Sequence, residues 1–234
     1  MLLVPFLGFI SIFHSLQYVK EKSIQYNIDD SHNWKHSLAV FKEGRYLLEQ
    51  QCKNYNQKSK QIVYLGCILH DMCDHKYMNV TDGLQEIHNF LNKTVLDEEI
   101  VNSVMTIIPR ISYSKTVENN AFQLPQDLVN YSYIDEYHMI RHSDLLTGYN
   151  LFRPIEMRYE ESIRNNKTIH MNVILDESEQ VINNRIFKML EYNLFIERFA
   201  KQKAIKYHKL AKYKYTQWKN ANITDYHILR KILN

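Results

Sequence analysis

The sequence predicts a single all-helical domain, and three features of its composition support this fold class. It has only 5 Gly and 4 Pro among 234 residues, whereas sandwiches and doubly wound sheets need many tight turns built from these residues. Apolar residues make up 45% and charged residues 24%, which is ordinary for a globular protein with one good core or two small ones. The 17 Tyr and 10 Phe provide bulky side chains for a helical interior.

Helical patterns begin near the N-terminus and continue past the middle of the chain. We expect a first helix over about 9–21 and a polar loop over 26–31, in which Asp30 or Ser31 caps the next helix. That second helix carries apolar residues at helical spacing from Leu38 to Leu48.

The most apolar internal run covers residues 62–69 and follows a polar segment, 54–60, that predicts a loop. This run is short enough to be a buried strand on periodicity alone. Because no turn signal separates it from His70 and Asp71, we expect a helix that includes both residues.

Glycine and proline mark the expected ends of the following helices. A helix is expected to start at residues 81–83, and another, over 96–108, to stop at Pro109. Pro125 is expected in the first turn of a helix that reaches Leu146 and ends at Gly148.

The C-terminal tail, residues 178–218, predicts one or two long helices with an apolar and a basic side. A solvated surface explains the basic side better than binding of nucleic acid or an acidic membrane does. No linker or repeat divides the chain. We therefore expect one domain over 1–234, with a core at about 25–165 and a C-terminal helical extension at about 176–219.

Charge and cysteine content limit the classes of function. The net charge of +3 is too small to indicate a nucleic-acid partner by itself. Three cysteines, Cys52, Cys67 and Cys73, do not make a disulfide framework, and reduced thiols suit a cytoplasmic protein. Without a CxxC pair, Cys67 and Cys73 are better explained as small apolar residues of the core than as metal ligands.

The first 19 residues contain no Asp, Glu, Lys or Arg. This segment is at the limit of the roughly 20 mostly apolar residues that a membrane helix needs. It also lacks the positively charged start of a secretory signal. We expect a helix that covers the core, with a membrane anchor formed by residues 1–19 as the less favoured alternative.

The adjacent residues His70 and Asp71 carry the strongest chemical signal in the sequence. A carboxylate at the end of an apolar run is costly unless it is paired or bound to a metal ion. Neighbouring helical residues point about 100° apart, so a shared ion needs further ligands from other helices. His36 and Asp144 are the best candidates, although each alone would more often be a structural histidine or a helix cap.

The order of these residues resembles the HD hydrolase superfamily: an isolated His, a His-Asp doublet in an apolar helix and a distant Asp before a hydrophobic pair. Here these elements are similar to segments 36–40 (HSLAV), 66–71 (GCILHD) and 143–146 (SDLL). Within this superfamily the sequence most resembles the branch of small stand-alone HD proteins. The segments that carry this resemblance are 32–36 (HNWKH), 73–77 (CDHKY), 111–114 (ISYS) and 187–190 (FKML). The resemblance covers roughly residues 25–215.

The sequence departs from that branch around Asp144. His142 and Thr147 stand where the branch has outer aspartates, and Leu145 replaces an arginine. The usual glycine-rich stretch is replaced by 149–154 (YNLFRP). The four expected ligands are present, so the departures put the substrate in doubt rather than the metal.

The resemblance implies a phosphohydrolase that acts on a nucleotide or other small phosphoester through a metal-activated water. Two imidazoles and two carboxylates favour one divalent transition metal (Mn, Fe, Ni or Zn) over the alternative, Mg. The competing hypotheses are a catalytically degenerate HD module that binds a nucleotide or protein partner, a nucleic-acid binder and a membrane-tethered hydrolase.

Six further residues are candidates for roles beside the metal. Asp74 is proposed as a proton acceptor or as a hydrogen-bond partner of a ligating histidine, with a surface charge as the alternative. Lys76 is proposed as a phosphate contact, with an exposed lysine as the alternative. His32 is expected to be an extra ligand, a substrate contact or a surface residue. The remaining phosphate candidates are Arg110, Lys115 and Arg153.

Overall fold

The computed structural model describes residues 3–51 and 55–234, with side chains from residue 11 onward. Within these residues the predicted all-helical fold class is confirmed, and the sheet is a single hairpin of β1 (Val117–Glu118) and β2 (Ala121–Phe122). The α-helices are α1 (Leu3–Gln25), α2 (Trp34–Gln50), α3 (Gln57–Leu69), α4 (Val80–Thr94), α5 (Glu98–Ile107), α6 (Tyr113–Thr116), α7 (Ile134–Thr147), α8 (Arg153–Arg164), α9 (Met171–Val181), α10 (Arg198–Ala221) and α11 (Tyr226–Leu233).

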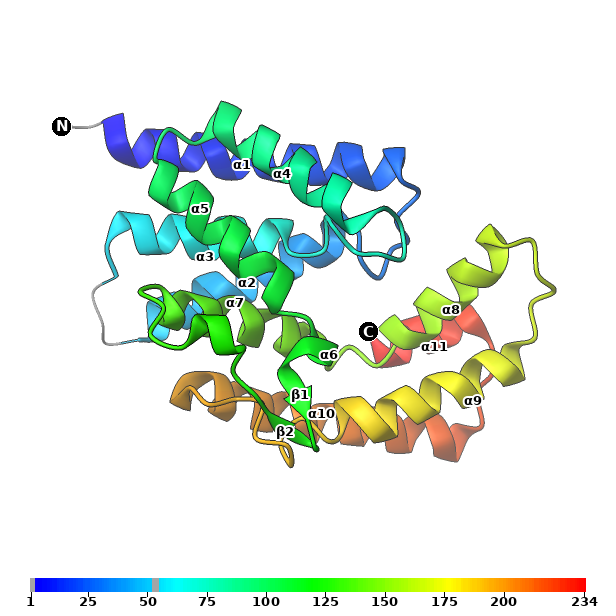
Figure 1. Ribbon diagram of the computed structural model, residues 1–234. Helices are drawn as coiled ribbons and strands as arrows, with labels where there is room; N and C mark the ends of the chain where they lie inside the picture. The colour runs from blue at the N-terminus through cyan, green and yellow to red at the C-terminus, as the bar shows by residue number, and fades with distance from the viewer. Residues whose placement is uncertain (1–2, 52–54) are drawn as a thin grey trace.

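Helix α3 lies in the middle of the fold because its apolar run is buried on every side. Among residues 62–69, all but Tyr64 are buried, as expected for a helix surrounded by other helices. It packs against α1, α2, α5 and α7. In Figure 1, α1, α3, α2 and α7 follow one another downward from α1 at the top, α5 runs diagonally across them, and α10 lies below.

Side-chain caps set the starts of the two helices that lead to the site. Helix α2 begins after Asn33, whose side-chain oxygen accepts a hydrogen bond from the Lys35 amide at 2.8 Å, so neither Asp30 nor Ser31 is the cap. Helix α3 begins after Asn56, which accepts from the Ser59 amide at 2.8 Å. The predicted loop at 54–60 therefore becomes helical from Gln57.

Helix α7 joins two hydrophobic clusters. Its first half contributes residues such as Met139 and Ile140 to a cluster with α1–α5. Its last turn contributes Leu145 and Leu146 to a second cluster with α8–α11. Asp144 therefore lies at the junction of the two clusters.

Two helix ends differ from the sequence-based expectation, and a third agrees with it. Helix α5 stops at Ile107, and Pro109 lies in a short 3₁₀ turn, η1 (Ile108–Arg110). Pro125 precedes a second 3₁₀ turn, η2 (Gln126–Leu128), so α7 starts later than predicted. The predicted end at Gly148 is confirmed, because its amide bonds the carbonyls of the last turn of α7.

The C-terminal tail is divided more finely than predicted. Helix α9 continues into a π-helical segment, η3 (Ile182–Ile186), and α10 starts only at Arg198. On α10, Lys203 pairs with Glu43 at 2.6 Å and Lys219 with Glu179 at 2.8 Å, so part of the basic side is neutralised. None of the helices in the described ranges has the length and apolarity that crossing a bilayer requires.

Two of the cysteines are buried free thiols. Burial raises the pKa of the Cys73 thiol to about 11 and also raises that of Cys67, so both are protonated at neutral pH. This agrees with their expected role as small core residues. Cys52 lies outside the described residues.

Candidate metal centre

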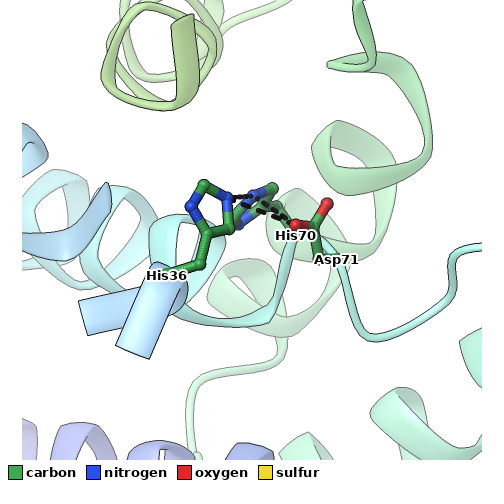
Figure 2. A group of neighbouring side chains, drawn as sticks. All are labelled: His36, His70 and Asp71. Carbon is green, nitrogen blue, oxygen red and sulfur yellow. Dashed lines mark hydrogen bonds and ion pairs between the residues drawn. The ribbon is translucent and has the colours of Figure 1, made fainter. Parts of the chain in front are cut away.

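His36 and His70 point toward each other from α2 and the end of α3. Their Nε2 atoms are 3.1 Å apart, and Oδ2 of Asp71 lies 3.3 Å from each (Figure 2). The three side chains offer ligand atoms that all lie within 4.8 Å of one another. This is the spacing expected of donors around one ion.

Asp144 adds a second carboxylate from α7. Its Oδ1 atom lies 3.4 Å from Nε2 of His36 and 3.7 Å from Nε2 of His70. The structure therefore brings together all four side chains that the sequence pattern selected. We refer to His36, His70, Asp71 and Asp144 as the candidate metal centre; metal binding itself stays a prediction.

The His-Asp doublet lies in a turn and not inside a helix as expected. Helix α3 ends at Leu69 and His70 is its C-terminal cap. Successive turns follow, with the Met72 amide bonded to the Leu69 carbonyl and the Asp74 amide to the Asp71 carbonyl. His70 keeps helical backbone angles (φ −56°, ψ −34°), so the doublet lies at the open C-terminal end of α3.

The backbone also selects the tautomer of His70. Its Nδ1 atom lies 2.9 Å from the Cys67 carbonyl, which can only accept a hydrogen bond. In the neutral imidazole the proton is therefore on Nδ1, and the Nε2 lone pair faces Asp71 and Asp144. Histidine ligands of metal ions are commonly oriented in this way.

The charges in the centre depend on one another. Burial opposes the charged form of His70, but Asp71 and Asp144 outweigh it and raise the pKa of His70 to about 10. Burial likewise opposes ionisation of the two carboxyls, yet His70 and His36 hold the pKa values of Asp71 and Asp144 well below the usual range. Both carboxylates are thus ionised at neutral pH.

The donor set fits a divalent cation. Among the described residues, the buried Oδ2 atom of Asp71 has no hydrogen-bond donor in good geometry, although it faces both imidazoles. A buried carboxylate oxygen without a donor is costly, and a bound cation would satisfy it. Two imidazole nitrogens and two carboxylate oxygens suit a transition metal.

Arg153, in the first turn of α8, bridges the two carboxylates. Its Nη2 atom lies 3.6 Å from Oδ2 of Asp71, and its Nη1 atom lies 3.6 Å from Oδ1 of Asp144. Its Nε donates to the Ser31 carbonyl at 2.7 Å, which fixes the direction of the guanidinium. This predicted phosphate contact therefore lies directly beside the candidate metal centre.

A cavity of about 550 Å³ opens onto His70, Asp71 and Asp144. This volume lies in the range of small-molecule sites. Five further predicted site residues line it: His32, Asp74, Lys76, Lys115 and Arg153.

Arg110 is outside this cavity, so the structure does not place it with the other predicted residues. Its Nε donates to Oδ2 of Asp127 at 2.6 Å, and its Nη1 to the Thr106 carbonyl at 2.5 Å. A carboxylate of the 3₁₀ turn η2 thus holds this side chain on the protein surface.

The two ring nitrogens of His32 contact Lys76 and Ser31. Lysine can only donate, so the contact of 3.4 Å between its Nζ and Nε2 of His32 makes this nitrogen the acceptor. Burial lowers the pKa of His32, and the positive charge of Arg153 lowers it further. The ring therefore stays neutral and can accept this hydrogen bond. Asp74 lies on the other side of Lys76, with its Oδ2 atom 3.6 Å from Nζ.

Sequence reasoning did not find Asp29 or Arg185. Buried Asp29 accepts hydrogen bonds from the Ser31 amide at 3.0 Å and from the Tyr77 hydroxyl at 2.5 Å, which holds the loop before α2. Arg185, on η3, lines the cavity with its guanidinium 4.1 Å from the centroid of the Tyr113 ring. Neither residue belongs to a motif, so only the three-dimensional arrangement reveals them.

Comparison with protein-family models and with curated proteins finds no match for this chain. The functional argument therefore depends on the candidate metal centre and its cavity.

Proposed function

We propose that this chain is a phosphohydrolase of the HD type that hydrolyses a nucleotide or other small phosphoester through a metal-activated water. One observation carries the proposal: two imidazoles and two carboxylates from separate parts of the chain face one another beside Arg153. The same residues occupy the order that resembles the HD pattern.

The four side chains of the candidate metal centre would hold one divalent ion. Manganese, iron, nickel and zinc suit the nitrogen and oxygen donors, and magnesium is the alternative. Such an ion supplies an acidified water and neutralises charge on a phosphoryl oxygen.

The chain's own cations would bind and orient the substrate. Arg153 presents a planar fork beside both carboxylates, which matches two oxygens of one phosphate. Lys76, held between His32 and Asp74, presents a point charge at the same cavity. Asp74 lines the cavity and would accept a proton there.

A degenerate HD module that binds a nucleotide or a protein partner without turnover is the second candidate. The observation in its favour is the altered sequence around Asp144, where His142 is wholly buried. Burial and the neighbouring Arg141 hold the pKa of His142 well below its usual range, so this residue adds no charge to the site.

The setting that best fits either candidate is the cytoplasm, because the two buried thiols are unpaired. The expected ligand is a small phosphorylated molecule. We expect no nucleic-acid partner, since part of the basic side of α10 is already paired with carboxylates.

The decisive experiment combines metal analysis with a panel of nucleotides and phosphomonoesters. We expect about one bound metal ion per chain and release of phosphate or nucleoside from part of the panel. Asp71→Ala should lose both, whereas His14→Ala, at an exposed histidine of α1, should keep both. Unchanged turnover in Asp71→Ala would refute the hydrolase proposal, and tight binding without turnover in the unaltered chain would favour the degenerate module.

A further inference from the structure

The charged groups of the cavity divide into three sets. The carboxylates Asp71 and Asp144 belong to the candidate metal centre, and the pair Asp74 and Lys76 balances itself at 3.6 Å. The third set consists of cations that line the same cavity, namely Arg153, Lys115 and Arg185.

Lys115 and Arg185 have no carboxylate at ion-pair distance among the described residues. The Lys115 ammonium donates to the Pro109 carbonyl at 2.7 Å, which fixes its position without neutralising it. Arg185 lies over Tyr113, two residues before Lys115, so both cations belong to one wall formed by α6 and η3.

The carboxylates whose charge acts on the Arg185 guanidinium are Asp144 and Asp71 of the candidate metal centre. Desolvation lowers the pKa of the Arg185 guanidinium, and the charge of Arg153 lowers it further, whereas Asp144 and Asp71 oppose this shift. A divalent ion on Asp71 and Asp144 would cancel their charge. Arg153, Lys115 and Arg185 would then face the cavity as three uncompensated positive charges.

This surplus exceeds what one phosphate group can neutralise. A phosphate monoester carries about −1.5 to −2 charges at neutral pH, which leaves at least one cation of the cavity unpaired. Lys115 and Arg185 are exposed at the cavity wall, so phosphate oxygens can form charge-assisted hydrogen bonds with them at a small desolvation cost. A ligand with two phosphate groups removes the surplus.

We propose that the substrate carries two phosphate groups, one at the metal ion and Arg153, the other on Lys115 and Arg185. This inference rests on the proposed function and narrows its substrate class to diphosphates or bisphosphates. The apolar side chains of Met157, Ile186 and Met189 also line the cavity and would contact the organic part of the ligand.

The test compares two ligands that cannot be hydrolysed, methylphosphonate and methylenediphosphonate, by calorimetric titration of the metal-loaded chain at a fixed free-metal concentration. We expect methylenediphosphonate to bind at least tenfold more tightly. Arg185→Gln and Lys115→Gln, on different elements, should each reduce the ratio of the two affinities by about tenfold. Each variant should keep its affinity for methylphosphonate within about twofold of the unaltered chain. Lys188→Gln is the matched control, because this lysine pairs with Glu191 at 2.7 Å and does not line the cavity.

Turnover of adenosine diphosphate and adenosine 3′,5′-bisphosphate then distinguishes the two arrangements of the phosphates. Equal affinities of the unaltered chain for methylenediphosphonate and methylphosphonate would overturn this inference. So would equal losses of affinity for both phosphonates in Arg185→Gln and Lys115→Gln. If the chain nevertheless binds metal and hydrolyses a monoester, the proposed function survives. If it binds neither metal nor phosphonate, the proposed function fails together with this inference.

Discussion

The Nε2 atoms of His36 and His70 face each other at 3.1 Å, with a carboxylate oxygen of Asp71 3.3 Å from each. Hydrogen bonding at Nδ1 already fixes the orientation of the His70 ring. The two nitrogens therefore converge on a shared position without any rotation of His70.

Arg153 is expected to act on the phosphate and not on the metal. Arg153→Gln should lower kcat/KM for a phosphoester by about 10²–10³-fold, because a charged donor beside the reacting group is lost. Arg153→Lys should recover only part of the activity, since a lysine cannot present the planar fork. Kinetics and metal analysis on the same samples check this, and a loss of metal equal to the loss of activity would contradict it.

Metal uptake is expected to release a proton. The pKa of His70 is raised to about 10 in the metal-free centre, so the imidazole is protonated at pH 7.5 and must lose that proton to bind a cation. Raising the pH removes the competing proton, and the apparent metal affinity should increase by about tenfold per pH unit up to about pH 10. Calorimetric titration in buffers of different ionisation enthalpy should count about one proton per ion, and a count of zero would show that His70 is neutral before binding.

Gly66 is expected to control the approach of α3 to α7. A methyl group at this position would lie 2.3 Å from Cδ1 of Ile140. Gly66→Ala should therefore lower the free energy of unfolding by about 1–3 kcal/mol through overpacking. Adding Ile140→Val removes that carbon, and the double variant should be more stable than the sum of the single changes predicts. Denaturant titration of all four chains measures this coupling, and strict additivity would argue against the contact.

Arg141 is expected to destabilise the protein. Its side chain is wholly buried, and two of its three guanidinium nitrogens have no hydrogen-bond partner among the described residues. Burial lowers its pKa from 12.5 to about 10, so the cost of charging the folded state is fully present at pH 7 and fades only as the pH rises through 10.

Arg141→Met should raise the free energy of unfolding at pH 7 by about 1–3 kcal/mol. Arg141→Lys, which keeps a buried charge, should bring no such gain. Chemical denaturation distinguishes the two variants, and a less stable methionine variant would mean that the stacking of the guanidinium over the Phe122 ring, 4.1 Å from its centroid, outweighs the cost of burial.

The sequence by itself determined the helical class and the types of residue at the candidate metal centre. Few Gly and Pro, periodic apolar residues and the run before His70 act over one or two helical turns, so they are visible without a structure. Asn33 and Asn56 show the limit of this local information. Both are good caps, but neighbouring residues such as Asp30 and Ser31 cap equally well in isolation.

Only the tertiary structure decided which side chains meet. Arg110 and Arg153 both appeared able to bind phosphate, yet Asp127 holds one on the surface while the Ser31 carbonyl directs the other to Asp71 and Asp144. Arg185 joins the cavity wall through the packing of η3 against Tyr113. Such tertiary contacts depend on how helices far apart in the sequence pack their apolar faces together, and no short stretch of sequence contains that information.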